Sequence, residues 1–176
     1  MIIYFLRHAS AGHSLLNTQK DERRPLDEEG TLQARYVGRL LANLDVQVEQ
    51  LVSSPLKRSR QTASLVANEL AFEGAVQLDD ALRPQAQVAD FQALLTRLRK
   101  HEAVMVVGHN PSLSEFLSKI VSAGAGAARI ELKKGSVAKV EIAGRSGILD
   151  WLVTPKIARA LQSSRKRSSR PKTSRK

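Results

Sequence analysis

The sequence contains no cysteine, and aromatic residues make up only 4% of its 176 residues. The absence of cysteine excludes a disulfide scaffold, a thiolate metal site and a cysteine nucleophile. Four histidines must therefore supply much of any nucleophilic or acid–base chemistry. No apolar run approaches the roughly 20 residues of a membrane span, and Arg7 and His8 interrupt the N-terminal apolar stretch before it could act as a signal peptide. We therefore expect a cytoplasmic protein.

Acidic residues are absent from the C-terminal part of the chain. The net charge is +11, yet nine Lys or Arg lie at or after Lys156 without one acid, which leaves 19 basic against 17 acidic residues before it. Residues 163–176 also hold no apolar side chain, so burial cannot offset their ordering entropy. With 42% hydrophobic residues, the remainder can form a real core. We predict one domain over residues 1–155 and a basic, disordered extension over 156–176.

Apolar periodicity predicts strands that alternate with helices. Residues 1–6, 50–54 and 103–107 are apolar runs that favour strands buried on both faces, as in a parallel sheet. The helical patterns begin near Asp27, Pro55, Val88 and Pro111. A short strand over 75–78, a loop over 123–128, and a tight hairpin that joins strands 136–142 and 148–153 complete the prediction. This order predicts a three-layer α/β/α sandwich with a mostly parallel sheet and a C-terminal antiparallel hairpin.

Basic and histidine side chains follow the predicted strands. In sheets of this class, ligands bind outside the carboxyl ends of the strands. Those ends carry Arg7 and His8, then Ser54 with Arg58 just beyond, and then His109. Two arginines match phosphate oxygens, because each guanidinium can donate two parallel hydrogen bonds. The pattern indicates a site for a phosphoryl group.

The chemistry that these residues favour is phosphoryl transfer to a histidine. A neutral imidazole at His8 can attack phosphorus in line and form a phosphohistidine that water then hydrolyses. Arg7 and Arg58 would hold the equatorial oxygens, and His109 would add a donor from the opposite side. Because the protein supplies the cations, we expect no metal and no cofactor.

At these positions the sequence resembles the histidine phosphatase superfamily, in its branch of SixA-type phosphohistidine phosphatases. The resemblance covers about residues 1–155 and is carried by LRHA at 6–9, RPLDEEG at 24–30, SSPLKRSRQTA at 53–63 and VGHNP at 107–111. It implies a phosphoglycerate mutase-like fold with His8 as phosphoacceptor. It further implies a phosphate pocket completed by Arg7, Arg58 and His109, with Arg24 as a further contact to the phosphate oxygens.

The larger branches of this superfamily carry an acidic proton donor in an insertion that this chain lacks. Only Asp79 and Asp80 lie in the corresponding stretch. A phosphoramidate leaves as an imidazole and needs less protonation than an alkoxide does, so we expect phosphohistidine on a partner protein as the substrate. If Asp79, Asp80, Asp21, Glu22 or a protonated His109 supplies a proton, the alternative is a phosphomonoesterase that acts on a small metabolite.

Several residues near these motifs have simpler structural interpretations. Ser54 is interpreted as a helix N-cap, and His13 as a solvated loop residue. His101 suits the C-terminal end of a helix, where a cation interacts well with the dipole. Trp151 is interpreted as a core residue of the last strand.

The basic extension supports an alternative outside enzymology. Its charge would attract polyanions without sequence specificity, so the chain could be a polyanion-binding module on a degenerate phosphatase fold. No motif for specific nucleic-acid recognition accompanies the charge. The predicted domain shows no heptad seam, and we expect a monomer.

Overall fold

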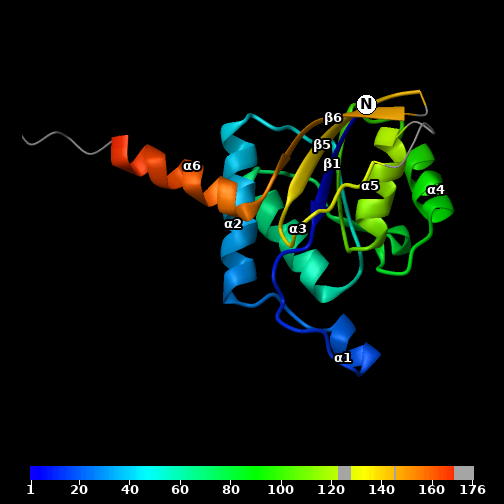
Figure 1. Ribbon diagram of the computed structural model, residues 1–176, viewed down its shortest axis with the longest axis horizontal. Coiled ribbons are helices and arrows are strands. Elements are labelled where there is room, and N and C mark those ends of the chain that lie inside the picture. Colours follow the sequence, from blue (N-terminus) through cyan, green and yellow to red (C-terminus); the bar gives the residue numbers. More distant parts are fainter. Residues whose placement is uncertain (123–127, 145, 169–176) are drawn as a thin grey trace, which may run out of the picture.

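The strands of the protein form one six-stranded sheet in the order β3-β2-β4-β1-β5-β6. A computed structural model describes residues 1–122, 128–144 and 146–168, with the backbone alone for 164–168. Strands β1 (Ile2–Arg7), β2 (Gln50–Ser53), β3 (Gln77–Leu78) and β4 (Ala103–Gly108) are parallel, whereas β5 (Val137–Ala143) and β6 (Ser146–Val153) pair antiparallel beside β1. The mostly parallel sheet with a C-terminal hairpin is confirmed (Figure 1).

Helices cover both faces of the sheet (Figure 1). Helices α2 (Glu28–Asn43), α3 (Lys57–Glu69) and α6 (Pro155–Ser168) pack on one face, and α4 (Val88–Leu98) and α5 (Ser112–Ser122) pack on the other. The alternation of side chains along β1 explains both layers, because Ile3 and Phe5 point toward α4 and α5, whereas Tyr4 and Leu6 point toward α2 and α3. A strand buried on both faces needs a continuous apolar run, as the sequence predicts. The three layers are confirmed.

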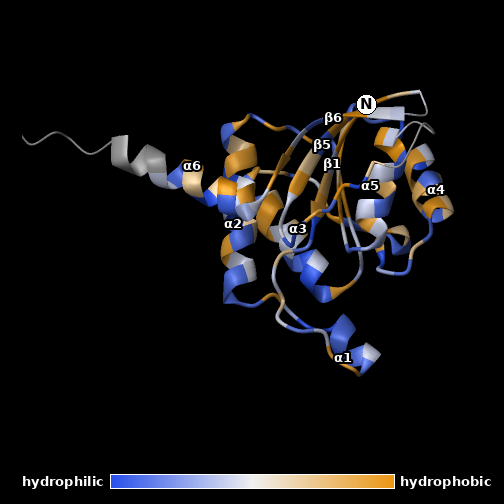
Figure 2. Ribbon diagram, viewed as in Figure 1, coloured by the Kyte–Doolittle hydropathy of each residue, from blue (hydrophilic) through white to orange (hydrophobic). Residues whose placement is uncertain are grey.

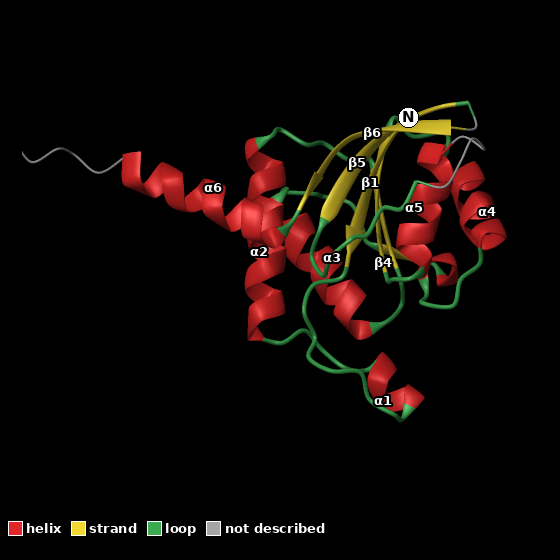
Figure 3. Cartoon of the chain, in the orientation of Figure 1, coloured by secondary structure: helices red, strands yellow, loops and turns green. Residues whose placement is uncertain are grey.

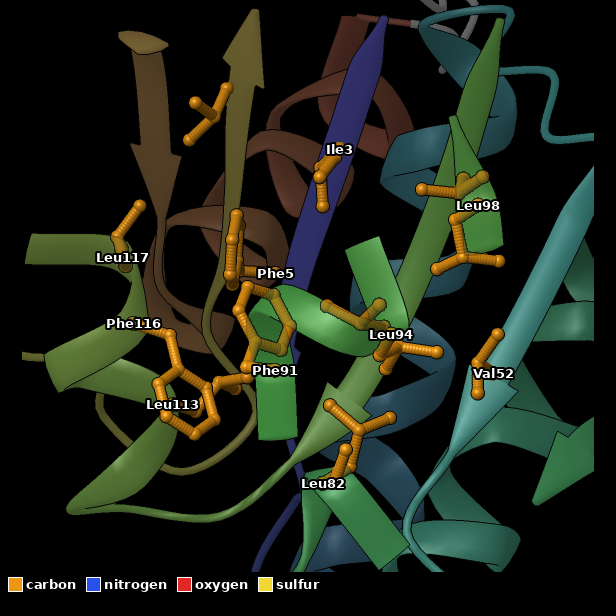
Figure 4. Packing of buried hydrophobic residues seen from close by; sticks show 14 of the residues in the cluster. Ile3, Phe5, Val52, Leu82, Phe91, Leu94, Leu98, Leu113, Phe116 and Leu117 are labelled. Carbon is orange, nitrogen blue, oxygen red and sulfur yellow. The ribbon is translucent and has the colours of Figure 1, made fainter. Parts of the chain in front are cut away.

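Aromatic residues are scarce, and three of the four phenylalanines meet in the layer under α4 and α5 (Figure 4). Phe91 stacks on Phe116 with ring centroids 4.5 Å apart and planes inclined by 7°, and Phe5 lies 5.6 Å from Phe91. Such pairs contribute roughly 0.5–1.5 kcal/mol beyond the area that they bury. The apolar residues of α4 and α5 are visible as orange segments in Figure 2. This cluster joins both helices to the sheet at β1.

Two short elements were not predicted from the sequence. Helix α1 (Thr18–Glu22) buries none of its residues, so it has no apolar periodicity to detect, and it lies at one end of the molecule (Figure 3). The 3-10 helix η1 (Asp80–Leu82) is too short for such a pattern. Helix α3 begins at Lys57 rather than at Pro55, because Leu56 is extended and occupies the N-cap position. The predicted loop over 123–128 and hairpin turn over 144–147 lie partly outside the described residues.

The start of the C-terminal extension is ordered, contrary to the prediction. Residues 156–168 belong to α6, which projects from the sandwich in Figure 1, and residues 169–176 lie outside the described part. Ala158 is fully buried beside α2, and the Gln162 side-chain amide donates to the Tyr36 carbonyl at 2.7 Å. The argument from composition applies to residues 163–176, whereas the residues that anchor the helix, Ala158 and Gln162, precede that stretch. No helix in the described ranges is long and apolar enough to cross a membrane.

Helix α2 holds the loop that follows β1. The Asp27 carboxylate caps α2 at the Gly30 amide and also accepts from the Ser10 hydroxyl at 2.7 Å and the Gly12 amide at 2.8 Å. The Gln33 side-chain oxygen accepts from the Ser10 amide at 3.0 Å. At Gly30 the two segments are so close that a Cβ would lie 1.9 Å from the Ser10 carbonyl oxygen. Only glycine fits there, and this contact sets the path of the chain after His8.

We predict that Gly30→Ala destabilises the protein by about 1–3 kcal/mol, the usual range for overpacking. The added methyl group must displace the Ser10 carbonyl and with it the loop after β1. The free energy of unfolding in urea measures the effect. Arg35→Ala, on an exposed position of the same helix, is the matched control and should change stability by less than about 0.5 kcal/mol. Equal free energies of unfolding for the two variants would show that the loop after β1 moves to accommodate the methyl group without loss of stability.

Candidate active site

Three strands end together and bring two histidines side by side. Arg7 pairs with Gly108 in the register of β1 with β4, and Ser53 pairs with Val107 in the register of β2 with β4. The next residue of each strand therefore lies at the same edge of the sheet. The ring centroids of His8 and His109 are 4.8 Å apart, with planes inclined by 53°. The prediction that the strand ends converge is confirmed by this geometry.

The His8 imidazole presents one nitrogen without a proton. Its side chain is buried, and Nδ1 lies 2.7 Å from the Ala9 carbonyl oxygen, which can only accept. Nδ1 therefore carries the hydrogen, and Nε2 keeps its lone pair. Burial lowers the pKa of His8 to about 3. The positive charges of Arg58, Arg7 and Lys134 act in the same direction, whereas the hydrogen bond to Ala9 raises the pKa. The ring is neutral at physiological pH and can act as a nucleophile.

The His109 imidazole is held by Ser54. Its Nε2 lies 2.9 Å from the Ser54 hydroxyl, and that hydroxyl also accepts from the Leu56 amide at 3.4 Å. If the hydroxyl donates its own hydrogen to Nε2, the proton of the neutral ring resides on Nδ1. Burial lowers the pKa of His109 to about 2. The proximity of His8, beside which a second positive charge would be unfavourable, and the charges of Arg58 and Arg7 act in the same direction. In that tautomer, His109 is a neutral hydrogen-bond donor through Nδ1.

Arg58 is buried, although it lies in the first turn of α3. Its Nη1 donates to the Asp21 carbonyl at 2.8 Å and lies 3.1 Å from the Asp21 carboxylate. Burial of Asp21 opposes ionisation, but hydrogen bonds from the Leu15 amide and from Arg24 outweigh it and lower the pKa of Asp21. The carboxylate is thus charged at neutral pH. It fixes one end of the Arg58 guanidinium and leaves Nε available.

Three buried donors at this site have no partner. Among the residues that the structure describes, the buried side-chain nitrogens and oxygens without a hydrogen bond are Arg7 Nε, Arg58 Nε, His109 Nδ1 and Ser136 Oγ. Arg7 reaches the site from the end of β1, with its Nη1 donating to the Leu132 carbonyl at 2.7 Å. Unpaired buried donors are costly and rare in native proteins. Two guanidiniums and a neutral imidazole with free N–H groups form a cationic site suited to an oxyanion.

The motif residues that do not reach the site hold the chain around it. The Thr62 hydroxyl accepts from the Ala9 amide at 3.1 Å and donates to the Arg58 carbonyl at 2.8 Å. The Gln61 side chain accepts from the Leu26 amide at 2.8 Å. These bonds join three motifs that are far apart in the sequence. They hold the first turns of α3 against the loop after β1 and the segment before α2.

Arg24, predicted as a phosphate contact, braces the loop after β1. Its Nε donates to Asp21 at 2.9 Å, and its Nη1 donates to the carbonyls of Ala11 and Gly12. Each of these partners lies in the loop or in α1. Its part in phosphate binding stays a prediction, whereas its structural role follows directly from these bonds.

The four carboxylates predicted as candidate proton donors are all engaged. Asp21 is ionised beside Arg58. Glu22 and Asp80 both pair with Arg83, at 2.7 and 2.5 Å. Asp79 accepts from the Ala81 amide at 2.9 Å, and it also pairs with an arginine of α4. Each of the four carboxylates is therefore paired with an arginine, and a role as proton donor stays a prediction.

Two residues near the histidines, Lys134 and Arg83, were not predicted from the sequence. A third, Ser54, was predicted only as a helix cap. Lys134 donates to the Gly12 carbonyl at 3.2 Å, and its charge contributes to the low pKa of His8. Arg83 contributes to the low pKa of His109, and its carbonyl accepts from the Ser112 hydroxyl at 3.1 Å. Ser54 was interpreted as a helix cap, yet it contacts His109. No local spacing could have indicated these contacts, because each joins segments far apart in the sequence.

The remaining predictions for single residues agree with the structure. His13 is exposed in the loop after β1. His101 follows α4 and lies 3.1 Å from the Glu49 carboxylate. Trp151 is half-buried, with its ring centroid 6.0 Å from that of Tyr4. Within the described ranges no group of three or more His, Asp or Glu side chains could hold a metal ion, and the expectation of metal-independent chemistry stays a prediction.

Comparison with known proteins identifies the family. The histidine phosphatase superfamily (branch 1) matches residues 3–89, which include three of the four predicted catalytic residues. A protein of Picosynechococcus sp., described as uncharacterized, is 31% identical over 140 residues, or 78% of this chain and 82% of that protein. The chain belongs to the histidine phosphatase superfamily, branch 1.

The SixA-type resemblance is also confirmed. Phosphohistidine phosphatase SixA of Escherichia coli is 24% identical over 167 residues, which cover 92% of this chain and all of SixA. The solved structure of the protein histidine phosphatase SixA with tungstate superposes with a TM-score of 0.78 at 23% identity, over 89% of this chain and 98% of that one. A phosphoglycerate mutase of Bacillus anthracis gives a TM-score of 0.72 at 15% identity, over 90% and 95% of the two chains. The predicted phosphoglycerate mutase-like fold is confirmed.

We predict that the two buried histidines make the protein less stable in acid. The unfolded chain binds protons at His8 and His109 below about pH 6.5, whereas the folded chain binds them only near pH 3 and 2. The unfolded state therefore holds more protons between these values, and the free energy of unfolding falls as the pH drops, by up to about 1.4 kcal/mol per pH unit for each histidine.

Urea unfolding between about pH 5.5 and 7 measures this slope where Asp and Glu, with ordinary pKa values of about 4, are nearly all ionised. His109→Gln removes one of the two groups and should make the slope shallower. His13→Gln, at an exposed position, is the control and should keep the wild-type slope. A His109→Gln slope equal to that of wild type would mean that His109 is not held neutral in the folded protein.

Proposed function

We propose that the protein is a phosphatase that forms a covalent phosphohistidine at His8 and acts on phosphohistidine of a partner protein. The observation that carries this proposal is the set of unpaired buried donors of Arg7, Arg58 and His109 around a neutral imidazole. Membership of the superfamily supports phosphatase chemistry, and the full-length similarity to a phosphohistidine phosphatase supports the choice of substrate. Catalytic roles for His8, Arg7, Arg58 and His109 are part of this proposal.

In the first step, the lone pair on His8 Nε2 attacks phosphorus and forms an N–P bond. The N–P bond of the substrate breaks, and its electron pair goes to the leaving imidazole nitrogen, which takes a proton from water. Arg7 Nε, Arg58 Nε and His109 Nδ1 donate to the phosphoryl oxygens, where charge develops. The phosphorylated His8 ring is cationic, and its Nδ1–H bond to the Ala9 carbonyl stabilises that charge.

In the second step, water attacks phosphorus from the side opposite to His8. The bond between phosphorus and Nε2 breaks, its electron pair returns to Nε2, and the water proton passes to solvent as inorganic phosphate forms. The low pKa of His8 favours this cycle, because the free imidazole is released neutral and is ready for the next attack. Neither step requires a group that the chain does not supply.

The protonation states of Asp21 and His109 support phosphohistidine, rather than a phosphate monoester, as the substrate. An alkoxide leaving group requires a strong general acid, whereas imidazole is a much better leaving group. Asp21 is ionised, and His109 is neutral, so neither offers a readily given proton at neutral pH. The site can therefore bind either kind of phosphate, but it is better suited to cleaving the N–P bond.

The direct test is to trap the intermediate by rapid quench with a 32P-labelled phosphohistidine protein. Wild type should carry acid-labile, base-stable label and release inorganic phosphate. His8→Ala removes the nucleophile, and should carry no label and turn over at least about 10³-fold more slowly. His101→Gln, distant from the site, is the matched control and should retain label and turnover.

The other outcomes of this test separate the alternatives. Label that appears only with small phosphomonoesters would keep His8 as nucleophile and overturn the proposed substrate. Label on His8→Ala would overturn the nucleophile. A wild-type chain that neither carries label nor releases phosphate from any of these substrates would contradict the proposed function and favour polyanion binding.

A further inference from the structure

A groove of about 710 Å³ opens beside the catalytic edge and shares Arg7 with it. Its walls come from the first turns of α2, the segment before β5 and the start of α6. The pairing of the strands places these parts together, because Leu6 pairs with Val137 and Val137 pairs with Val153. The beginning of β5 and the end of β6 therefore lie where β1 ends. Anything that follows β6 directly must start at the catalytic edge.

The groove is basic, and most of its cations have no acidic partner. Of its twelve lining residues, five are basic, namely Arg7, Lys133, Lys134, Lys156 and Arg159, and two are acidic, Glu29 and Glu131. Among the described side chains, no carboxylate forms an ion pair with the lysines or with Arg159. A positive surface whose lysines and Arg159 form no close ion pair attracts an acidic partner.

The cations of α6 also stand where they cost stability. Lys156 lies in the first turn of the helix, which holds no acid, so its charge opposes the positive end of the helix dipole. Arg159 lies one turn further on the exposed side, whereas Ala158 is buried against α2. A bound anionic partner would neutralise the charges of Lys156 and Arg159. Such a partner would explain why basic side chains occupy the start of α6.

The groove also has an apolar part, which distinguishes its occupant from a bare polyanion. Leu32 is 46% exposed on α2, and Tyr36 and Pro155 line the same groove. On the neighbouring turns of α6, Ile157 and Leu161 are 46% and 50% exposed. Exposed leucine and isoleucine beside lysine and arginine match a protein segment that carries both acidic and apolar side chains.

We propose that this groove binds an acidic segment next to the phosphohistidine of the protein substrate. The proposal rests on the proposed function and specifies how the substrate is chosen. Because Arg7 borders both the phosphate pocket and the groove, a phosphoryl group held at Arg7 Nε places the residues that flank it on Lys156 and Arg159. The contact adds affinity and association rate for acidic phosphoproteins and leaves the chemistry at His8 unchanged.

The test compares two short phosphohistidine peptides that differ only in their flanks, glutamate in one and glutamine in the other, with phosphoramidate as a substrate without flanks. For wild type at low salt, kcat/KM for the glutamate peptide should exceed that for the glutamine peptide by about tenfold. Lys156→Glu/Arg159→Glu should bring this ratio to one or below and leave phosphoramidate turnover unchanged. Glutamate in the first turn also suits the helix dipole, so α6 should persist.

Lys100→Glu/Lys119→Glu makes the same change of charge on the opposite layer of the sandwich and should keep the wild-type ratio. A groove variant that keeps the wild-type ratio would overturn the proposal. So would a control variant that loses the ratio equally, because the effect would then come from net charge. Loss of α6 in the groove variant is detected by circular dichroism, and Lys156→Gln/Arg159→Gln then replaces it.

A second measurement keeps the groove testable if the proposed function fails. Failure of that function means that wild type cleaves neither peptide nor phosphoramidate. Fluorescence anisotropy with the unphosphorylated glutamate peptide then reports binding alone. Weaker binding to the groove variant than to the control variant supports the docking surface, and equal binding overturns it. Displacement of the peptide from wild type by polyphosphate of lower charge would assign the groove to polyanions and overturn a protein occupant.

Discussion

Two neutral imidazoles are buried within 4.8 Å of each other, among guanidinium groups at one edge of a parallel sheet. Burial and surrounding positive charge both oppose protonation, so each ring remains a base or a donor and does not become a cation. A cluster of this kind stabilises nothing by itself, because its buried N–H groups lack partners. The surrounding fold must hold it in place, and most of the polar contacts at this edge serve that purpose.

That support comes from segments that contribute no atom to the phosphate site. Asp21 fixes the outer end of Arg58, while Arg24 fixes Asp21 and the loop after β1. Ser54 orients His109 from the end of β2. The Ala9 carbonyl accepts from Nδ1 of His8 and leaves the lone pair of the ring on Nε2. The unpaired nitrogens all belong to groups whose other ends are held, so a bound oxyanion can gain hydrogen bonds without reorganising the site.

The sequence predicts the parts of the fold that bury apolar side chains periodically. Residues 1–6 and 103–107 read as strands because both faces of the sheet are covered, and the helices after Asp27 and Pro111 show a single apolar stripe. Helix α1 escaped detection because it buries nothing and is joined to the body by ionic contacts. Helix α6 escaped because its anchoring depends on Ala158 and Gln162, residues that carry no pattern of their own.

The candidate site divides in the same way. Arg7, His8 and His109 could be predicted because each follows a recognisable strand, and Arg58 because motif spacing selects it from two basic neighbours. The contact of Ser54 with His109 and the approach of Lys134 to the loop after β1 depend on tertiary packing alone. The sequence predicts a disordered basic extension that attracts polyanions. Its first turns prove to border the catalytic edge, because the antiparallel hairpin returns the chain to the end of β1.

A crystal structure of the protein with orthovanadate tests the central claim most directly, because vanadate adopts the five-coordinate geometry of phosphoryl transfer. We predict vanadium bonded to Nε2 of His8, with equatorial oxygens that accept hydrogen bonds from Arg7 Nε, Arg58 Nε and His109 Nδ1. Vanadate bonded to another side chain, or bound at this edge while those three nitrogens remain unpaired, would contradict the account of the site.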